Sequence, residues 1–324
     1  MDVVGIRKWT FGLSALLFLA SIVTLAIPPA LTPGIDFSGG AAFTMTFADV
    51  LDPALVEKTL SDIGHPESIV QPSVEADGAY GKSYFIRVGE LAPTLRDTNG
   101  NIETPGGREN VESALNALSP ATVTGFDTVS GIIAGENVRN AAIAVVVAAF
   151  AILIYVTWAF RRVPSPFRYG TSAIIALIHD TVIVLGLFSI LGKVVDFEVN
   201  AMFITGVLTI IGYSVNDTIV VFDRVRENIA RFPTLTITEI VNLSVHETIA
   251  RSLNTSITLL IVVVALMLFA ATSIQPLLYV LVAGVVVGTY SSIFIATFTL
   301  VAWENGEIRN VASRIPIIGP KRAV

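Results

Sequence analysis

The chain has 324 residues, of which 53% are hydrophobic and 14% are charged, and its formal net charge is −6. Soluble domains carry about 25% charged residues, so this composition excludes an ordinary soluble protein, and we expect no nucleic-acid partner. With three His and no Cys, we expect neither disulfides nor a metal site, and no cofactor other than a proton used as coupling ion.

Six apolar runs are long enough to cross a bilayer, which takes about 20 residues. The first resembles a signal peptide, because Arg7 and Lys8 precede it and Pro28 follows it. Its length and the lack of a clear small-x-small cleavage site favour a retained anchor instead. The runs cover approximately residues 11–27, 141–160, 169–191, 199–222, 252–271 and 277–303.

A long polar region separates the first two runs, and its pattern predicts strands and helices in the order βαββαβ. Residues 42–47 alternate apolar and polar side chains, as a half-buried strand does. This order is typical of a ferredoxin-like α+β domain. The predicted elements are strands at 42–47, 68–75, 83–88 and 121–129, and helices at 52–63 and 108–118.

Residues 92–107 interrupt this pattern and are rich in Pro, Gly, Asn and Thr, which indicates an insertion. Within them, 97–101 weakly resembles a calcium loop, but the Gly is misplaced and the closing Glu is missing. We therefore interpret 97–101 as an Asn-Gly turn.

The distribution of Lys and Arg in short loops predicts the orientation of the chain, because such residues concentrate on the cytoplasmic side. One side has most of them, at both termini and around 161–168 and 224–231, whereas the other has only Lys193. Both termini are therefore expected in the cytoplasm. The predicted divisions are a first transmembrane helix at 1–29, an extracytoplasmic domain at 30–138, a five-helix transmembrane domain at 139–303 and a cytoplasmic tail at 304–324.

Two charged residues lie in or beside apolar runs: Asp217 in the fourth and Arg251 at the start of the fifth. A charge inside the membrane costs roughly 2.5–3.5 kcal/mol on insertion scales and usually marks an ion or proton pathway. We expect the two residues to face each other, so that a change in their pairing binds or releases a proton. A static ion pair is the alternative, and Arg251 could instead extend to the interface. Asn216 flanks Asp217, and Asn254 and Thr255 continue a polar stripe from Arg251.

His179 and Asp180 lie together in the middle of the third run. A proton relay and a structural hydrogen bond to a neighbouring helix are both compatible with this pair.

Small residues mark two further features. In the sixth run, four-residue spacing predicts a close helix-packing face. After the first run, glycines allow backbone conformations that other residues avoid, which predicts either a rigid turn or a hinge. The packing residues are Gly284, Gly288 and Ser292, and the hinge residues are Gly34, Asp36, Gly39 and Gly40.

Four segments together resemble the SecF family of protein-export membrane proteins. They are GIDFSGG at 34–40, ALIHD at 176–180, IGYSVNDTIVVFDRVREN at 211–228 and RSLNTS at 251–256. The chain departs from the family pattern at Ser38, where Thr is usual, and at 129–132, just before the second run.

The resemblance implies a subunit of the bacterial inner membrane that pairs with SecD as one half of an RND-like assembly. It implies association with the SecYEG channel and promotion of the export of unfolded preproteins by the proton-motive force, after the SecA step. It also implies that Asp217 and Arg251 lie on the proton path. Whether SecD is a separate chain is left open.

Two other functions fit the sequence: half of an RND-type transporter for a small molecule or lipid, and a passive scaffold of the channel. An enzyme is not expected, because neither a nucleophile–base set nor a phosphate-binding loop is evident. Six spans are few for an alternating-access carrier, because such carriers are commonly built from related halves. We therefore expect a SecD-like chain to supply the other half, and we expect contact with membrane lipid.

Overall fold

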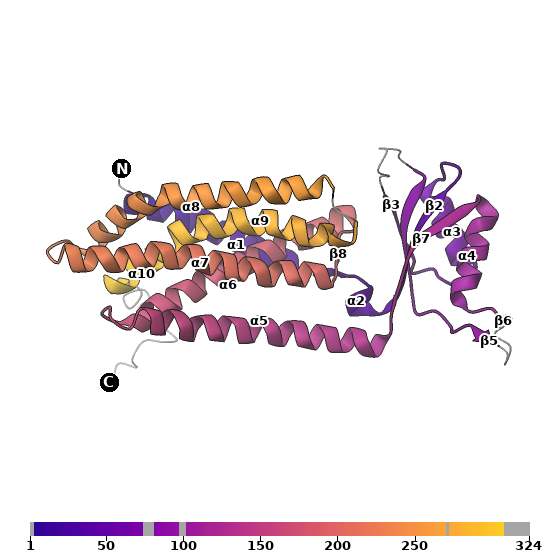
Figure 1. The fold of residues 1–324 in the computed structure, drawn as a ribbon, viewed down its shortest axis with the longest axis horizontal. Helices are drawn as coiled ribbons and strands as arrows, with labels where there is room; N and C mark the ends of the chain where they lie inside the picture. The colour runs from indigo at the N-terminus through magenta and orange to yellow at the C-terminus, as the bar shows by residue number, and fades with distance from the viewer. Residues whose placement is uncertain (1–2, 74–80, 97–101, 270–271, 308–324) are drawn as a thin grey trace, which may run out of the picture. The chain divides into compact units, whose positions relative to one another are not determined.

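The structure is a computed structural model that describes residues 3–73, 81–96, 102–269 and 272–307. The chain divides into two compact units. The helical unit comprises Met1–Thr32 and Ala141–Val324, and the α+β unit comprises Pro33–Asn140 (Figure 1).

Six helices of the described chain are long and apolar enough to cross a membrane, which confirms the six predicted spans. The chain is therefore a multi-pass membrane protein. The long helices are α1 (Arg7–Ala26), α5 (Gly131–Ala159), α6 (Pro166–Val195), α7 (Ala201–Arg231), α8 (Ile237–Met267) and α9 (Gln275–Ser291), which continues through the π-helical segment η3 (Ser292–Ala296) into α10 (Thr297–Glu304). Short elements are η1 (Val4–Ile6), η2 (Thr272–Ile274), β1 (Thr32–Pro33) and β8 (Glu198–Val199).

Polar side chains cap the N-termini of α7 and α8. Asn200 caps α7 by accepting a hydrogen bond from the backbone N of Phe203 at 2.9 Å. Thr236 and Glu239 form a reciprocal capping box at the start of α8. Consequently α8 begins well before the apolar run at 252–271, and Arg251 lies near the middle of this helix instead of at its start.

Helix α9 is the centre of the helical unit, where it packs against α6, α7 and α8, while α1 packs against α6 (Figure 1). Its most extensive contact is with α7. The buried faces of α6, α7 and α8 therefore all contact α9.

The α+β unit contains a four-stranded sheet with the strand order β3-β4-β2-β7, in which β2 pairs antiparallel with β4 and β7, and β3 with β4. Apolar side chains of the sheet pack with Val56 and Leu60 of α3 and with Val111 and Leu115 of α4. The elements are α2 (Ile35–Ser38), β2 (Gly40–Phe47), α3 (Pro53–Asp62), β3 (Ile69–Ser73), β4 (Ser83–Val88), β5 (Leu95–Arg96), β6 (Ile102–Thr104), α4 (Gly107–Leu118) and β7 (Ala121–Val129).

The predicted order of strands and helices in this region is confirmed. The predicted insertion contains a further antiparallel pair, β5 with β6. The turn interpretation of 97–101 lies outside the described residues.

Candidate functional site

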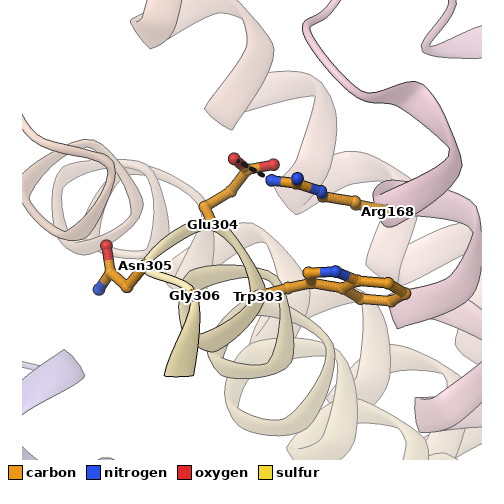
Figure 2. A pocket seen from close by; sticks show the side chains of 5 residues that line it. All are labelled: Arg168, Trp303, Glu304, Asn305 and Gly306. Atoms are coloured by element: carbon orange, nitrogen blue, oxygen red, sulfur yellow. Dashed lines mark hydrogen bonds and ion pairs between the residues drawn. The ribbon is translucent and has the colours of Figure 1, made fainter. Parts of the chain in front are cut away.

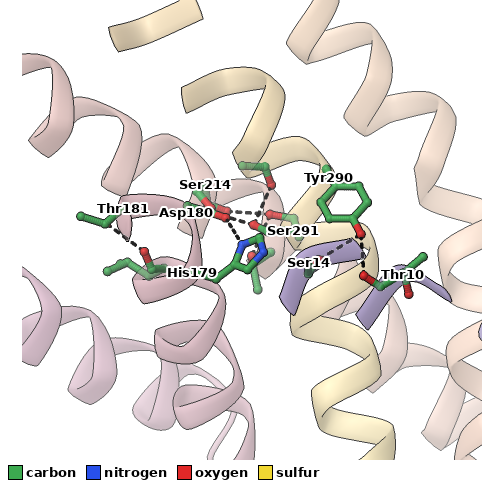
Figure 3. Close-up of polar contacts among 12 residues, drawn as sticks. Thr10, Ser14, His179, Asp180, Thr181, Ser214, Tyr290 and Ser291 are labelled. Atoms are coloured by element: carbon green, nitrogen blue, oxygen red, sulfur yellow. Dashed lines mark hydrogen bonds and ion pairs between the residues drawn. The ribbon is translucent and has the colours of Figure 1, made fainter. Parts of the chain in front are cut away.

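Buried polar side chains from four helices gather inside the helical unit, and Figure 3 shows those of α6, α7 and α9 that meet at Asp180. Each is at most 7% exposed, although the surrounding segments are membrane-spanning. Polar groups buried in this way usually require partners, so their contacts are specific. We call this set the polar core: His179 and Asp180 of α6, Ser214, Asp217 and Thr218 of α7, Ser252 and Ser256 of α8, and Ser291 and Ser292 of α9 and η3.

Asp180 joins three of these helices. Its Oδ2 accepts hydrogen bonds from Ser214 Oγ of α7 and Ser291 Oγ of α9, both at 2.6 Å, and its Oδ1 lies 3.0 Å from His179 Nδ1 (Figure 3). Distances of 2.5–2.7 Å are typical of hydroxyl donors to a carboxylate. Asp180 is thus the acceptor at the point where α6, α7 and α9 meet.

The π-helical segment η3 begins directly after Ser291. Ser292 Oγ donates to the backbone O of Ser214 at 3.0 Å and lies 2.9 Å from Thr218 Oγ1. Single π-turns inside α-helices are rare, and those that occur are frequently found at functional sites. The irregular part of the last span therefore begins at Ser292, which bonds to α7.

Asp217 is 5% exposed, with Ser252 of α8 as its polar neighbour. Within the described residues, neither Asp217 Oδ2 nor Ser252 Oγ has a hydrogen-bond partner. A buried carboxylate oxygen without a donor is costly, and protonation or a bound water removes that cost. Asp217 is thus a buried carboxyl with one free proton-binding atom.

The predicted pairing of Asp217 with Arg251 is not formed within the described residues of this chain. Arg251 is exposed, whereas the buried face of α8 presents Ser252 and Ser256. Neighbouring residues on a helix point about 100° apart, so the stripe was assigned one residue away from the face that packs. Asn216, Asn254 and Thr255 are exposed as well, and Thr255 Oγ1 donates to the backbone of its own helix.

Sequence reasoning missed most of the hydroxyl groups that complete the polar core. Ser256 Oγ lies 2.6 Å from Thr289 Oγ1 and 2.9 Å from Tyr213 Oη, which links α8 to α9 and α7. The sequence gives little indication of such side chains, because a Ser or Thr hydroxyl inside a helix can hydrogen-bond to the backbone carbonyl one turn back. Such a residue is therefore compatible with an apolar span. A useful signal was the four-residue spacing of Ser252 and Ser256.

The predicted packing residues lie against α7. A β-carbon on Gly284 would fall 2.4 Å from Ile210 Cγ2, and one on Gly288 would fall 3.0 Å from Ser214 Cβ. Together with Ser292, these positions bring α9 close enough to α7 for the hydrogen bonds of the polar core.

The predicted hinge residues form a tight turn within the α+β unit. Gly34 precedes α2, the backbone O of Asp36 accepts a hydrogen bond from Asn137 Nδ2 at 3.0 Å, and Gly39 and Gly40 have φ of 76° and 116°. A β-carbon on Gly40 would lie 2.5 Å from the Val88 carbonyl oxygen. Gly39 and Gly40 are therefore required by the turn itself.

A pocket of about 370 Å³ lies at the end of α10, lined by Arg168, Trp303, Glu304, Asn305 and Gly306 (Figure 2). Arg168 Nη1 donates to Glu304 Oε2 at 2.6 Å. Arg168 lies three turns from His179 along α6, about 16 Å at 1.5 Å per residue, so the pocket is separate from the polar core. In the described ranges, no cluster of three or more His, Asp or Glu side chains could hold a metal ion.

Comparison with known proteins decides the family. The family model described as "Protein export membrane protein SecD/SecF, C-terminal" matches residues 110–306. The chain belongs to the SecD/SecF family. The resemblance predicted from the sequence motifs is thus confirmed. Within this family, the "Protein translocase subunit SecF" of Thermobaculum terrenum is 37% identical over 97% of both chains.

Longer members of the SecD/SecF family also match. The "Protein translocase subunit SecDF" of Bacillus subtilis is 33% identical over 95% of this chain, which corresponds to 39% of that protein. A crystal structure of SecDF from Thermus thermophilus, described as a translocon-associated membrane protein, is 30% identical with a TM-score of 0.78. The match covers 94% of this chain and 39% of that one. The chain therefore corresponds to a part of these longer proteins.

Proposed function

We propose that the chain is an accessory subunit of the Sec protein translocase, which acts with SecD and uses the proton-motive force to promote export of unfolded preproteins after the SecA step. The observation that carries the proposal is Asp217, a membrane-buried carboxyl with a free oxygen in a chain of the SecD/SecF family. One charge moved through the membrane field is worth about 2.3 kcal/mol per 100 mV, which is enough to bias a two-state packing of helices.

The exposed polar side chains of α7 and α8 support SecD as the partner. Arg251, Asn216 and Asn254 lie on the surface of the isolated chain within membrane-spanning helices. Contact of an Arg with lipid is unfavourable, so a second set of helices is the better cover for these residues. Relatives in which SecD and SecF form one chain supply such a set. In that setting, Arg251 would be brought to the proton path by the partner's helices.

For the α+β unit we propose a ferredoxin-like domain on the extracytoplasmic side that contacts the emerging preprotein near SecYEG. Its strand order, β3-β4-β2-β7, and its antiparallel pairing support this fold. The Lys and Arg bias of the short loops supports cytoplasmic termini in the bacterial inner membrane. The turn at Gly39 and Gly40 would transmit motion of the membrane helices to the α+β unit, because it is stiff.

The test is export of a model precursor in cells that lack the native subunits, with Asp217→Asn expressed at matched levels together with the SecD partner. Asn keeps the size of the side chain and removes its titration. We expect export to fall to the level of cells without the subunit, while the complex still assembles. Glu136→Gln, at an exposed carboxylate of α5, is the matched control and is expected to export normally.

Normal export by Asp217→Asn would contradict the proposal and favour a passive scaffold of the channel. A defect in small-molecule efflux without an export defect would favour an RND-type transporter instead.

A further inference from the structure

The second titratable centre of the polar core is the pair His179 and Asp180. His179 is 7% exposed, and its Nδ1 lies 3.0 Å from Asp180 Oδ1. Its Nε2 is buried and has no hydrogen-bond partner among the described residues. A buried ring nitrogen in a membrane-spanning helix normally has a partner, so its open position requires an explanation.

The hydrogen bonds around Asp180 indicate which atom of the pair is free. Ser214 and Ser291 both donate to Asp180 Oδ2 at distances typical of a carboxylate acceptor. With Asp180 ionised, Nδ1 of His179 carries the proton that points to Oδ1, and Nε2 keeps a lone pair. An added proton at Nε2 makes the pair neutral overall, whereas without it the pair places one negative charge in the membrane core.

The aromatic side chains beside the His179 ring are uncharged. The ring of Phe18 on α1 is nearly parallel to the imidazole, with centroids 6.3 Å apart, and the ring of Tyr290 on α9 is 6.5 Å away. Tyr290 Oη is already bonded to the backbone O of Thr10 and to Ser14 Oγ, both at 3.0 Å (Figure 3). From α7, Ser214 faces Asp180, and Asp217 follows on the same helix.

Asp180 also connects the pair to the irregular part of the last span. Ser291, its donor on α9, is the residue directly before η3, and Ser292 bonds α7 at the backbone O of Ser214. The strength of the two serine bonds depends on the charge of the carboxylate. A π-turn can move along a helix by a small change of hydrogen-bond register. The segment η3 is therefore suited to respond to a change in the charge of Asp180.

We propose that His179 Nε2 is a second proton-binding site of this protein, and that Asp180 transmits its protonation to α7 and α9 through Ser214 and Ser291. This inference rests on the proposed proton-driven function and adds a site and a mechanical connection to it. Asp180 is a positioning residue here, since the proton is bound at the imidazole. The site binds a proton alone, and η3 is the element that responds to its protonation.

Selective ¹⁵N-histidine labelling tests the site directly, because the chain contains only His65, His179 and His246. In a His65→Gln, His246→Gln background, the full chain with its SecD partner is placed in lipid bilayers and observed by solid-state NMR from about pH 8 to about pH 5. We expect the Nε2 signal of His179 to change from unprotonated to protonated in this range. Asp180→Asn is expected to abolish the change, because the imidazolium loses its anionic neighbour. An Nε2 that stays unprotonated at the lowest pH would overturn the proposal.

Hydrogen exchange of peptides that cover η3 tests the connection. We expect their protection to change over the same pH range as the His179 signal, and Ser291→Ala to remove the change in protection while His179 still titrates. Equal protection on both sides of the transition would overturn the transmission through Ser291. If His179 titrates but Asp217→Asn exports normally, the proposed function fails and the proton site stands. If His179 is silent but Asp217→Asn blocks export, only the present inference fails.

Discussion

Gly284 of α9 lies so close to Ile210 of α7 that a β-carbon on the glycine would fall 2.4 Å from Ile210 Cγ2. Real β-carbons do not approach other atoms so closely, so any side chain at this position must separate the two helices or displace Ile210. The same pair of helices carries Ser214, Thr218 and Ser292, whose hydrogen bonds require a short distance between the backbones.

Gly284→Ala is therefore expected to destabilise the helical unit by about 1–3 kcal/mol, the usual cost of overpacking. Thermal unfolding of the purified chain in detergent measures the effect. Gly212→Ala is the matched control, because a β-carbon on Gly212 of α7 would meet no atom within 4 Å. Equal melting temperatures for the two variants would show that α7 and α9 are not tightly packed at Gly284.

A second prediction concerns Asn228, which is fully buried where α7 and α8 extend beyond their apolar runs. Its Nδ2 donates to Ser244 Oγ at 2.9 Å and to Glu247 Oε2 at 2.8 Å. Asn228→Ala should cost about 1–3 kcal/mol, because it removes both hydrogen bonds and leaves the buried Ser244 Oγ without its donor, although Glu247 Oε2 keeps Arg224 Nε. Limited proteolysis of the residues between α7 and α8 should become faster. Arg226→Gln, at an exposed ion pair with Asp223, should change neither measurement, and an equal effect of both variants would contradict the role of Asn228.

The sequence predicted the helices and strands well, because apolar periodicity and caps act locally. It placed the start of α8 too late, since residues 237–251 are amphipathic and their helix is held by the capping box of Thr236 and by contacts with α7. Periodicity alone does not reveal a helix that continues beyond its apolar part.

The candidate site was only partly predictable. Asp217, His179 and Asp180 are evident because charged groups in apolar runs are costly. Which helices meet at Asp180 depends on how α6, α7 and α9 pack, and a single sequence does not specify that packing. The outward position of Arg251 follows from the preference of α8 to bury small hydroxyl side chains, Ser252 and Ser256, and to leave the large cation outside.

The pH dependence of the α+β unit can be predicted from Tyr84, which is fully buried and donates from Oη to the backbone O of Leu51 at 2.5 Å and of Gly81 at 3.0 Å. Burial, and then the nearby Asp52 carboxyl, raise the pKa of the Tyr84 hydroxyl above its ordinary value of about 10. The unfolded chain therefore loses this proton at a lower pH than the folded chain. The contribution of the hydroxyl to stability is complete below about pH 10 and is lost as the pH rises through the folded value.

Tyr84→Phe should accordingly lower stability by about 0.5–1.5 kcal/mol at neutral pH, the usual value of a hydrogen bond. The difference between the two proteins should shrink above about pH 10, since Phe does not titrate. Unfolding of the full chain at about pH 7 and at about pH 10.5 measures both effects. A difference that stays constant over this range would mean that the Tyr84 hydroxyl ionises no differently in the folded and unfolded chains.

The last prediction concerns Gly40, whose φ of 116° is a conformation that residues with a β-carbon rarely adopt. Gly40→Ala would combine this strain, about 1–3 kcal/mol, with a β-carbon 2.5 Å from the Val88 carbonyl oxygen at the edge of the β2–β4 pairing. Gly64→Ala is the matched control: its φ is 98°, but a β-carbon there would meet nothing within 4 Å. We expect Gly40→Ala to lower the melting temperature clearly more than Gly64→Ala. If both variants lose the same stability, the contact with Val88 is relieved by a backbone shift and the turn is a flexible hinge; a larger loss for Gly40→Ala identifies it as a stiff connection.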